Sequence, residues 1–372
     1  MTDSQAPLAI VFSGGGARGA YQAGVYSTLV RDERFKRPKI LVGTSAGAIN
    51  AALIAAGRSA DEVIEFWLRL GDGLPVSVNR KLDNSVLWGG LRAFGDLLRH
   101  PPSFRSAKTL VSRSVKHLWP PLPTTPVPIL LEWLLTQRFG FLDEFLNGFS
   151  QTAIADTTGL RAHLRDAFGG DEVKTDLNLG VNAVDAIRHR VVRFVNTPQQ
   201  TPSKEEYVLG PITVDMILAS CAIPILFPAV QITIAGVERY FWDGGMLSNT
   251  PMAPAVAMGA ERILPILSTE RVRAGGRLEN LGDALEHLAD MLLENSYNAD
   301  RKLLLHRNRN PAPERRSATL YTPIRPDGGV FDTGSFLHFE RSELQRMVTA
   351  GQAAATEWLR NAELDTLDRE SP

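Results

Sequence analysis

One serine of this chain stands in a pattern that is typical of hydrolytic enzymes. Ser45 lies between Gly43 and Gly47, in the form G-x-S-x-G. In a nucleophile elbow the serine sits on a sharp strand-to-helix turn, and flanking glycines relieve the crowding that a Cβ atom would cause. Gly43 and Gly47 are therefore expected to support the turn. The spacing makes Ser45 a candidate nucleophile, with the backbone N–H of Ala46 as one donor to an oxyanion. The alternative is a serine in an ordinary turn between a strand and a helix.

A run of glycines near the N-terminus could supply further oxyanion donors. Gly14, Gly15 and Gly16 follow an apolar segment and precede a helical pattern. Glycine backbones can direct successive N–H groups into one concavity at the start of a helix. We therefore expect these three residues to form an oxyanion loop, supported by the nearby positive charge of Arg18.

The same loop also satisfies a nucleotide-binding pattern, G-x-G-x-x-G, through Gly14, Gly16 and Gly19. In a dinucleotide-binding fold, an apolar strand that ends in an acidic residue is expected about 20 residues later. Here the acidic residues Asp32 and Glu33 lie in a charged turn instead. The sequence favours the oxyanion loop, with Gly19 as a supporting residue, and leaves nucleotide binding as the weaker alternative.

An aspartate late in the chain is the candidate base. Asp243 follows the apolar residues 240–242 and precedes the supporting residues Gly244 and Gly245, which allow the chain to turn. A free aspartate, with a pKa near 3.9, is a poor base for a serine. Apolar surroundings disfavour the charged carboxylate and so raise its affinity for a proton. The alternative is an ordinary Asp-Gly turn.

Other residues of the chain are weaker candidates for the base. Asp327 begins a second Asp-Gly-Gly, but it lacks a preceding strand-like run and stands among prolines, which is typical of a surface turn. The histidines have no distinguishing setting, and each is more typical of a structural or surface histidine than of a general base. The seven are His100, His117, His163, His189, His287, His306 and His338.

Short apolar runs predict the elements that would position these residues. Residues 8–12 have the pattern of a strand buried on both faces, which indicates a parallel sheet. Residues 39–42 predict a strand before the elbow, and the alanine-rich residues 48–56 favour a helix after it. Another helix is predicted to begin at Ser59, because Ser59 and Glu62 form a capping box. Later elements are predicted as strands at 177–184, 190–195 and 261–267, a hairpin at 232–240 and a helix at 281–305.

Composition excludes several classes of partner and site. The 372 residues include 44% hydrophobic residues and carry a formal net charge of −1, so no overall field would attract nucleic acid. Cys221 is the only cysteine, which excludes an internal disulfide and a cysteine-rich metal site and fits a reducing compartment. No metal site is predicted. The first residues lack the pattern of a signal peptide or membrane span, so a cytoplasmic location is expected.

Residues 71–159 differ in character from the rest of the chain. Prolines interrupt stretches rich in aromatic and aliphatic residues, with arginines and lysines between them. We expect a largely helical insertion that could act as a lid and make peripheral contact with a membrane, since apolar groups insert into lipid and cations meet phosphates. The alternative is that its apolar residues form the core of a helical subdomain.

Four segments, in order, resemble the patatin-like phospholipases: 13–24, 43–52, 219–228, and Asp243-Gly244-Gly245 with Asn249 and Pro251 beyond. The resemblance implies a three-layer α/β/α sandwich with a mainly parallel sheet, as a catalytic domain at 7–270. Residues 271–372, which the resemblance does not cover, are expected to form a mainly helical C-terminal extension packed on that domain. It also implies a Ser45–Asp243 dyad without histidine, oxyanion donors around Gly14 to Gly16, and no metal or organic cofactor.

Three functions follow from this resemblance. The first is a lipid acyl hydrolase that cleaves a phospholipid, lysophospholipid or related ester. The second is an acyltransferase that uses the same dyad, in which an alcohol rather than water takes the acyl group. The third is a non-catalytic lipid-binding protein, against which the intact serine, aspartate and glycine loop argue.

Overall fold

The computed structural model describes residues 6–72, 77–78, 153, 155–200, 205–271, 281–309, 317–331, 334–362 and 364–365. The chain divides into two compact units, one formed by Met1–Ser77 with Asp156–Pro372 and the other by Val78–Ala155. Most of the predicted insertion at 71–159 lies outside the described residues, so its helical character and its lipid contact stay predictions. The central sheet and the helices that cover it belong to the first unit.

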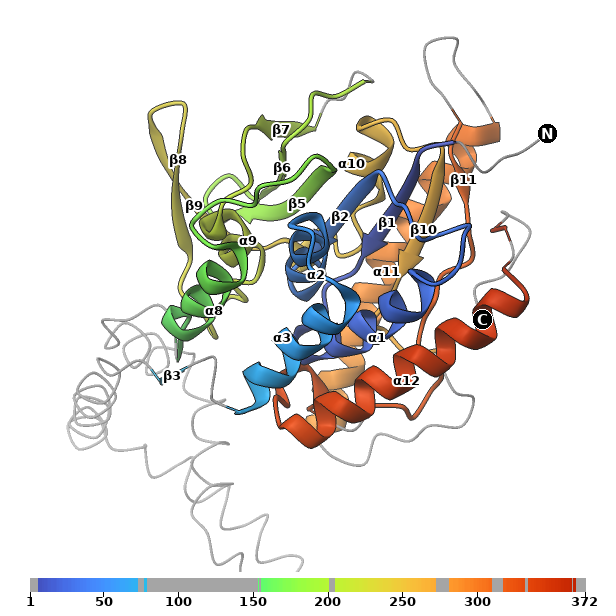
Figure 1. Cartoon of the computed structure of the whole chain (residues 1–372). Helices are drawn as coiled ribbons and strands as arrows, with labels where there is room; N and C mark the ends of the chain where they lie inside the picture. Colours follow the sequence, from blue (N-terminus) through green and yellow to red (C-terminus); the bar gives the residue numbers. More distant parts are fainter. Residues whose placement is uncertain are drawn as a thin grey trace, which may run out of the picture. The chain divides into compact units, whose positions relative to one another are not determined.

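A mainly parallel sheet forms the centre of the first unit (Figure 1). Its strands are β1 (Leu8–Phe12), β2 (Ile40–Thr44), β5 (Asn178–Asp185), β6 (Arg190–Val195), β7 (Glu206–Leu209), β8 (Val230–Ile234), β9 (Val237–Asp243), β10 (Arg262–Ile266) and β11 (Thr319–Leu320). The order is β11-β10-β1-β2-β5-β6-β7, while β9 pairs with β5 and β8 pairs with β9. All pairs from β11 to β5 and the pair β6–β7 are parallel, and the others are antiparallel. The strands β3 (Ser77–Val78) and β4 (Ala155–Asp156) form a separate pair.

Helices cover both faces of the sheet (Figure 1). The described helices are α1 (Gly19–Leu29), α2 (Ala46–Ala55), α3 (Ala60–Asp72), α8 (Thr158–Phe168), α9 (Val214–Ser220), α10 (Met252–Ala257), α11 (Leu281–Arg309) and α12 (Arg341–Arg360). Short 3₁₀ turns lie at η2 (Gly16–Arg18), η3 (Gly244–Met246) and η4 (Ser335–Leu337). One apolar core joins the sheet to α1, α2, α3, α9 and α12, and a second joins it to α10 and α11.

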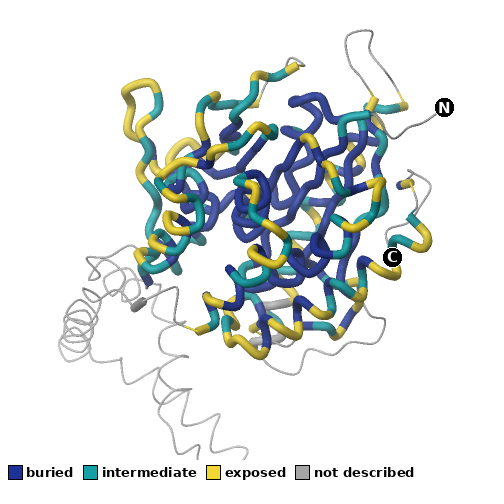
Figure 2. Tube along the Cα trace, viewed as in Figure 1, coloured by how far each residue is buried: buried dark blue, intermediate teal, exposed yellow. Residues whose placement is uncertain are grey.

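Strand β1 shows why the sequence forms three layers. Leu8, Ile10 and Phe12 belong to the first core, whereas Ala9 and Val11 belong to the second. Because successive side chains of a strand point to opposite faces, a fully apolar strand needs cover on both sides. Figure 2 shows the sheet as the buried centre of the unit. The predicted α/β/α sandwich with a mainly parallel sheet is confirmed.

Several predicted elements occur at or near their predicted bounds, including the helix that begins after Ser59. There the Ser59 N–H donates to the Glu62 carboxylate at 2.8 Å, and the Glu62 N–H donates to the Ser59 hydroxyl at 3.2 Å. Beyond residue 271, β11 joins the sheet and α12 packs against α1. No helix in the described part of the chain is both long and apolar enough to cross a membrane.

Candidate active site

Ser45 occupies the turn between β2 and α2. Its φ of 54° is positive, a conformation that a residue with a side chain adopts only when its surroundings hold it there. A Cβ atom on Gly43 would lie 2.1 Å from the Gly47 carbonyl oxygen, and one on Gly47 would lie 2.4 Å from the Phe12 oxygen. Both flanking glycines are therefore needed for the close packing of the elbow. The Ser45 N–H donates to the Ser220 hydroxyl at 2.8 Å, which anchors the turn to the end of α9.

The register of the sheet brings Asp243 to Ser45. Strand β2 pairs with the first part of β5, where Thr44 faces Asn182. Strand β9 pairs with the rest of β5 in the opposite direction, where Asp243 faces Ala183. Because β6 occupies the other edge of β5, both strands use the same edge and their final residues meet. Two segments 198 positions apart in sequence thus end at one point.

Asp243 is buried and its partners are a hydroxyl and an amide. It is 5% exposed, its carboxylate interacts with the Ser45 side chain, and it accepts a hydrogen bond from the Gly245 N–H at 2.7 Å. Burial raises the pKa of Asp243 to about 6, although the interactions with Gly245 and Ser45 favour the charged form. The carboxylate therefore has a higher proton affinity than a free aspartate while it is still mainly ionised at neutral pH.

The other candidate bases lie elsewhere. Asp327 is in a turn, and its side chain is 73% exposed. His100 and His117 lie outside the described residues. The five histidines within them are absent from the residues that line the pocket beside Ser45. Within the described part of the chain, no group of three or more His, Cys, Asp or Glu side chains is arranged to hold a metal ion.

The glycine loop lies beside Ser45, but its amides are not equivalent. The Gly14 N–H donates to the Asn249 side-chain oxygen at 3.0 Å and lies 3.2 Å from the Asn249 carbonyl, so it is already engaged. The N–H groups of Gly15, Gly16 and Ala46 have no acceptor among the described residues. Ala46 is the first residue of α2, where the helix itself offers no acceptor. These three amides are free to donate to an oxyanion, whereas Gly14 fixes the loop.

Arg18 does not present a free charge to the site. Its guanidinium is 1% exposed, donates to the Ser335 hydroxyl and the Ser268 carbonyl, and pairs with Asp290 at 2.8 Å. It also stacks on Phe336, 3.7 Å from the ring centre. Arg18 therefore supports the site structurally, because it connects the C-terminal part of the chain to the glycine loop.

Two supporting glycines allow close packing around the site. Gly19, which begins α1, allows close contact with the Trp67 ring, and Gly244 begins η3 behind Asp243.

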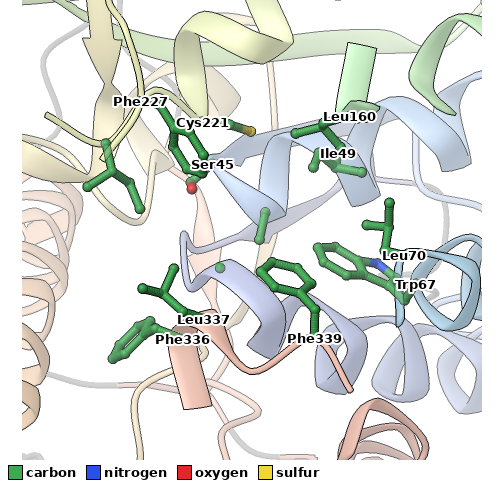
Figure 3. Close-up of a pocket in the computed structure, with 13 residues that line it drawn as sticks. Ser45, Ile49, Trp67, Leu70, Leu160, Cys221, Phe227, Phe336, Leu337 and Phe339 are labelled. Carbon is green, nitrogen blue, oxygen red and sulfur yellow. The ribbon is translucent and has the colours of Figure 1, made fainter. Parts of the chain in front are cut away.

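An apolar pocket opens beside the Ser45 hydroxyl (Figure 3). Gly16, Ser45 and Ala46 form its polar end, next to side chains from α2, α3, α8 and the segment after α9. The contribution of η4 and Phe339, which precede the C-terminal helix α12, carries no signal in the sequence and was not predicted. The apolar lining residues are Ile49, Trp67, Leu70, Leu160, Cys221, Ile223, Phe227, Phe336, Leu337 and Phe339.

The chain was compared with known families and proteins. A family model described as patatin-like phospholipase matches residues 10–256. The uncharacterized protein YqhO of Bacillus subtilis (strain 168) is 51% identical over 53 residues, which cover 14% of this chain and 18% of YqhO.

Two solved structures are among the similar ones. VipD from Legionella pneumophila is 15% identical with a TM-score of 0.39, over 97% of this chain and 68% of VipD. Human GIVD cytosolic phospholipase A2 is 12% identical with a TM-score of 0.39, over 96% of this chain and 60% of the human protein. The chain therefore spans about three fifths of the length of the human enzyme.

Proposed function

Because this chain belongs to the patatin-like phospholipase family, a family of lipid hydrolases, we propose that it cleaves fatty acyl esters through a Ser45–Asp243 dyad. The single observation that carries this proposal is that the Ser45 side chain interacts with the buried Asp243 carboxylate, whose pKa is raised to about 6. Nucleophile, base and free backbone amides lie together at the end of an apolar pocket. Acyl transfer by a serine requires these three components.

The first step is acylation of the serine. The Ser45 oxygen attacks the ester carbonyl carbon as its proton passes to the Asp243 carboxylate, and the carbonyl double bond opens to an oxyanion. The N–H groups of Gly15, Gly16 and Ala46 stabilise that negative charge. As the oxyanion collapses, the bond to the leaving alcohol breaks, and the alcohol takes the proton held by Asp243. Ser45 is left as an acyl ester.

The second step repeats the chemistry with water. Water donates a proton to Asp243 as its oxygen attacks the acyl ester, and collapse of the second oxyanion returns the proton to Ser45. The pKa of Asp243 suits both directions of transfer, because general bases act best when their pKa lies near the working pH. The free fatty acid then leaves, and the dyad is restored.

The pocket supports a lipid acyl group as the part of the substrate that is recognised. Its lining beyond Ser45 consists of aliphatic and aromatic side chains, with the Cys221 thiol among them. Burial raises the pKa of that thiol, which keeps it neutral beside an acyl chain. Phospholipids and lysophospholipids are the substrate class that we propose.

A panel of lipid esters with product analysis tests the proposal. The wild type should release free fatty acid from phospholipid or lysophospholipid, and the Ser45→Ala and Asp243→Asn variants should not. Asp327→Asn is the matched control, because it changes the other Asp-Gly-Gly at an exposed turn and should retain full activity. Hydrolysis that survives in Asp243→Asn would refute the dyad. An acylated alcohol as the main product would identify an acyltransferase instead.

A further inference from the structure

A short segment before α12 forms one side of the acyl pocket. Phe336, Leu337 and Phe339 line it, although they lie about 80 residues beyond the end of the family match at residue 256. Figure 3 shows their side chains on the side of the pocket opposite Ile49 and Leu160. The Leu337 side chain is 54% exposed, so it has apolar surface left to cover. This part of the site is therefore supplied by the chain outside the matched region.

The segment is fixed at both ends by backbone contacts that only glycine permits. A Cβ atom on Gly16 would lie 2.1 Å from the Phe336 carbonyl oxygen. A Cβ atom on Gly71, near the end of α3, would lie 2.7 Å from the Phe339 carbonyl oxygen. Real Cβ contacts are essentially never this short, so any side chain at either glycine would push the segment away. Residues 336–339 thus span the pocket from the oxyanion loop to α3.

Polar contacts reinforce the same attachment. The Arg18 Nε donates to the Ser335 hydroxyl at 2.8 Å, and the Arg18 guanidinium stacks on the Phe336 ring. Beyond Phe339, Arg341 pairs with Asp72 at the end of α3. The geometry of the segment is therefore set by the glycine loop and α3 together. Because residues 335–339 are attached at several points, they are held at a defined distance from Ser45.

We propose that residues 335–339 select the length of the acyl chain, with Leu337 and Phe339 contacting the methylene groups that lie beyond the ester. This inference rests on the proposed function and names the part of that site which sets its specificity. The space in the pocket that is open to the centre of a water-sized sphere is about 50 Å³, so the loss of one large side chain changes what the pocket can enclose. A short acyl group that stays near Ser45 does not need these contacts.

The size of the effect follows from the burial of methylene groups. Each methylene that moves from water into an apolar site raises the rate constant kcat/KM about fourfold. In Leu337→Ala and Phe339→Ala, the methylene groups of the substrate that lie next to the missing side chain gain less free energy on leaving water. We expect the ratio of kcat/KM for dodecanoyl over butanoyl esters to fall about tenfold. The value for butanoyl esters should fall less than the value for dodecanoyl esters, whereas a general loss of folded protein would lower both values equally.

The experiment measures kcat/KM for butanoyl, octanoyl and dodecanoyl nitrophenyl esters with the full chain. Leu209→Ala is the matched control, because Leu209 has a similar exposure of 58% and is absent from the pocket lining. Leu337→Ala is expected to fold normally, because the Leu337 side chain is already 54% exposed. Phe339→Leu, which keeps an apolar side chain, should recover part of the ratio lost in Phe339→Ala.

A binding measurement separates this inference from the proposed function. Calorimetry of octanoic and dodecanoic acid with Ser45→Ala protein needs no catalysis, and adding Leu337→Ala should weaken binding of the longer acid selectively. The inference would be overturned if the ester ratios of Leu337→Ala and Phe339→Ala matched that of the wild type and if Leu337→Ala left the affinity for dodecanoic acid unchanged. That result would leave the hydrolase proposal intact. A wild type that hydrolyses no ester, yet binds acids with the expected length dependence, would overturn the hydrolase proposal alone.

Discussion

Two buried aspartates on neighbouring strands have opposite electrostatic surroundings. Asp185 ends β5 and is 1% exposed, and Asp243 ends β9 and is 5% exposed. Burial would raise the pKa of Asp185, but hydrogen bonds from the Arg188 and Ile187 N–H groups and from the Arg239 and Arg188 side chains lower it to about 2. Burial raises the pKa of Asp243 to about 6.

The difference comes from what the sheet places opposite each carboxylate. Arg239 donates to Asp185 at 2.7 Å, so the negative charge of Asp185 is balanced and remains fixed. Asp243 meets a serine hydroxyl and one backbone amide, neither of which carries charge. Burial alone does not identify a functional carboxylate. A buried carboxylate that has no cation beside it and interacts with a candidate nucleophile is a much stronger indication.

The largest expected difference between the two aspartates is in catalysis. Asp243→Asn and Ser45→Ala should each lower kcat/KM by about 10⁴-fold, because acyl transfer loses its base or its nucleophile. Asp185→Asn should retain activity within about tenfold at a temperature where it is folded, since Asp185 takes no part in proton transfer. Steady-state kinetics of the three variants check this. An equal loss in Asp185→Asn and Asp243→Asn would abolish the distinction between them.

The second difference is in stability. Asp185→Asn should lower the free energy of unfolding by about 3 kcal/mol, because it leaves the buried Arg239 with only part of its negative partners. Glu206 still pairs with Arg239, which keeps the cost at the low end of the range for a broken buried pair. Urea unfolding at pH 7 measures the change. A variant as stable as the wild type would show that the Asp185–Arg239 pair contributes nothing.

The third difference is in the sign of the stability change, since Asp243→Asn should stabilise the protein whereas Asp185→Asn should destabilise it. Asp243→Asn should raise the free energy of unfolding at pH 7 by about 3 kcal/mol, because folding costs free energy when it buries an ionised Asp243. Between pH 4 and 6 the folded state binds more protons than the unfolded state, so the wild type loses stability as the pH rises through this window. The advantage of the variant should vanish below pH 4. Unfolding at both pH values checks this, and a less stable variant at pH 7 would contradict the raised pKa.

The smallest effect is the pH dependence of the wild type. Only ionised Asp243 accepts the serine proton, so kcat/KM should fall about tenfold for each pH unit below about 6. The titration of Asp185, near 2, should leave no step in this range. A pH–rate profile with a short-chain ester tests both statements. A flat profile between pH 4 and 7 would mean that another group, or no titrating group, supplies the base.

The nucleophile elbow was predictable because its signal is local. Gly43, Ser45 and Gly47 are close in sequence, and the strand and helix on either side have their own apolar patterns. Asp243 was identified from its apolar approach and the glycines that follow, and the structure brings it to Ser45. Strand β11, only two residues long, was missed because so short a segment has no periodicity.

The details that depend on distant contacts could not be predicted. The Gly14 N–H is engaged by Asn249, 235 positions away, and nothing in the glycine run itself distinguishes Gly14 from Gly15. The sequence shows Arg18 only as a positive charge near the glycine loop, because its partner Asp290 is 272 positions away. Phe339 carries no catalytic pattern, and its position at the pocket follows only from packing on Gly71. The sequence therefore predicts the two residues that we propose as reacting groups, whereas the roles of the residues around them depend on tertiary contacts.

Labelling with a fluorophosphonate tests the Ser45–Asp243 dyad most directly, because the reagent reports the nucleophile and its activation without any choice of lipid. The wild type should gain one adduct, on Ser45 by peptide mass analysis, at a rate that rises with pH through about 6. Asp243→Asn should label far more slowly, and Asp327→Asn should label as the wild type does. An adduct on another residue, or an undiminished rate in Asp243→Asn, would contradict the dyad.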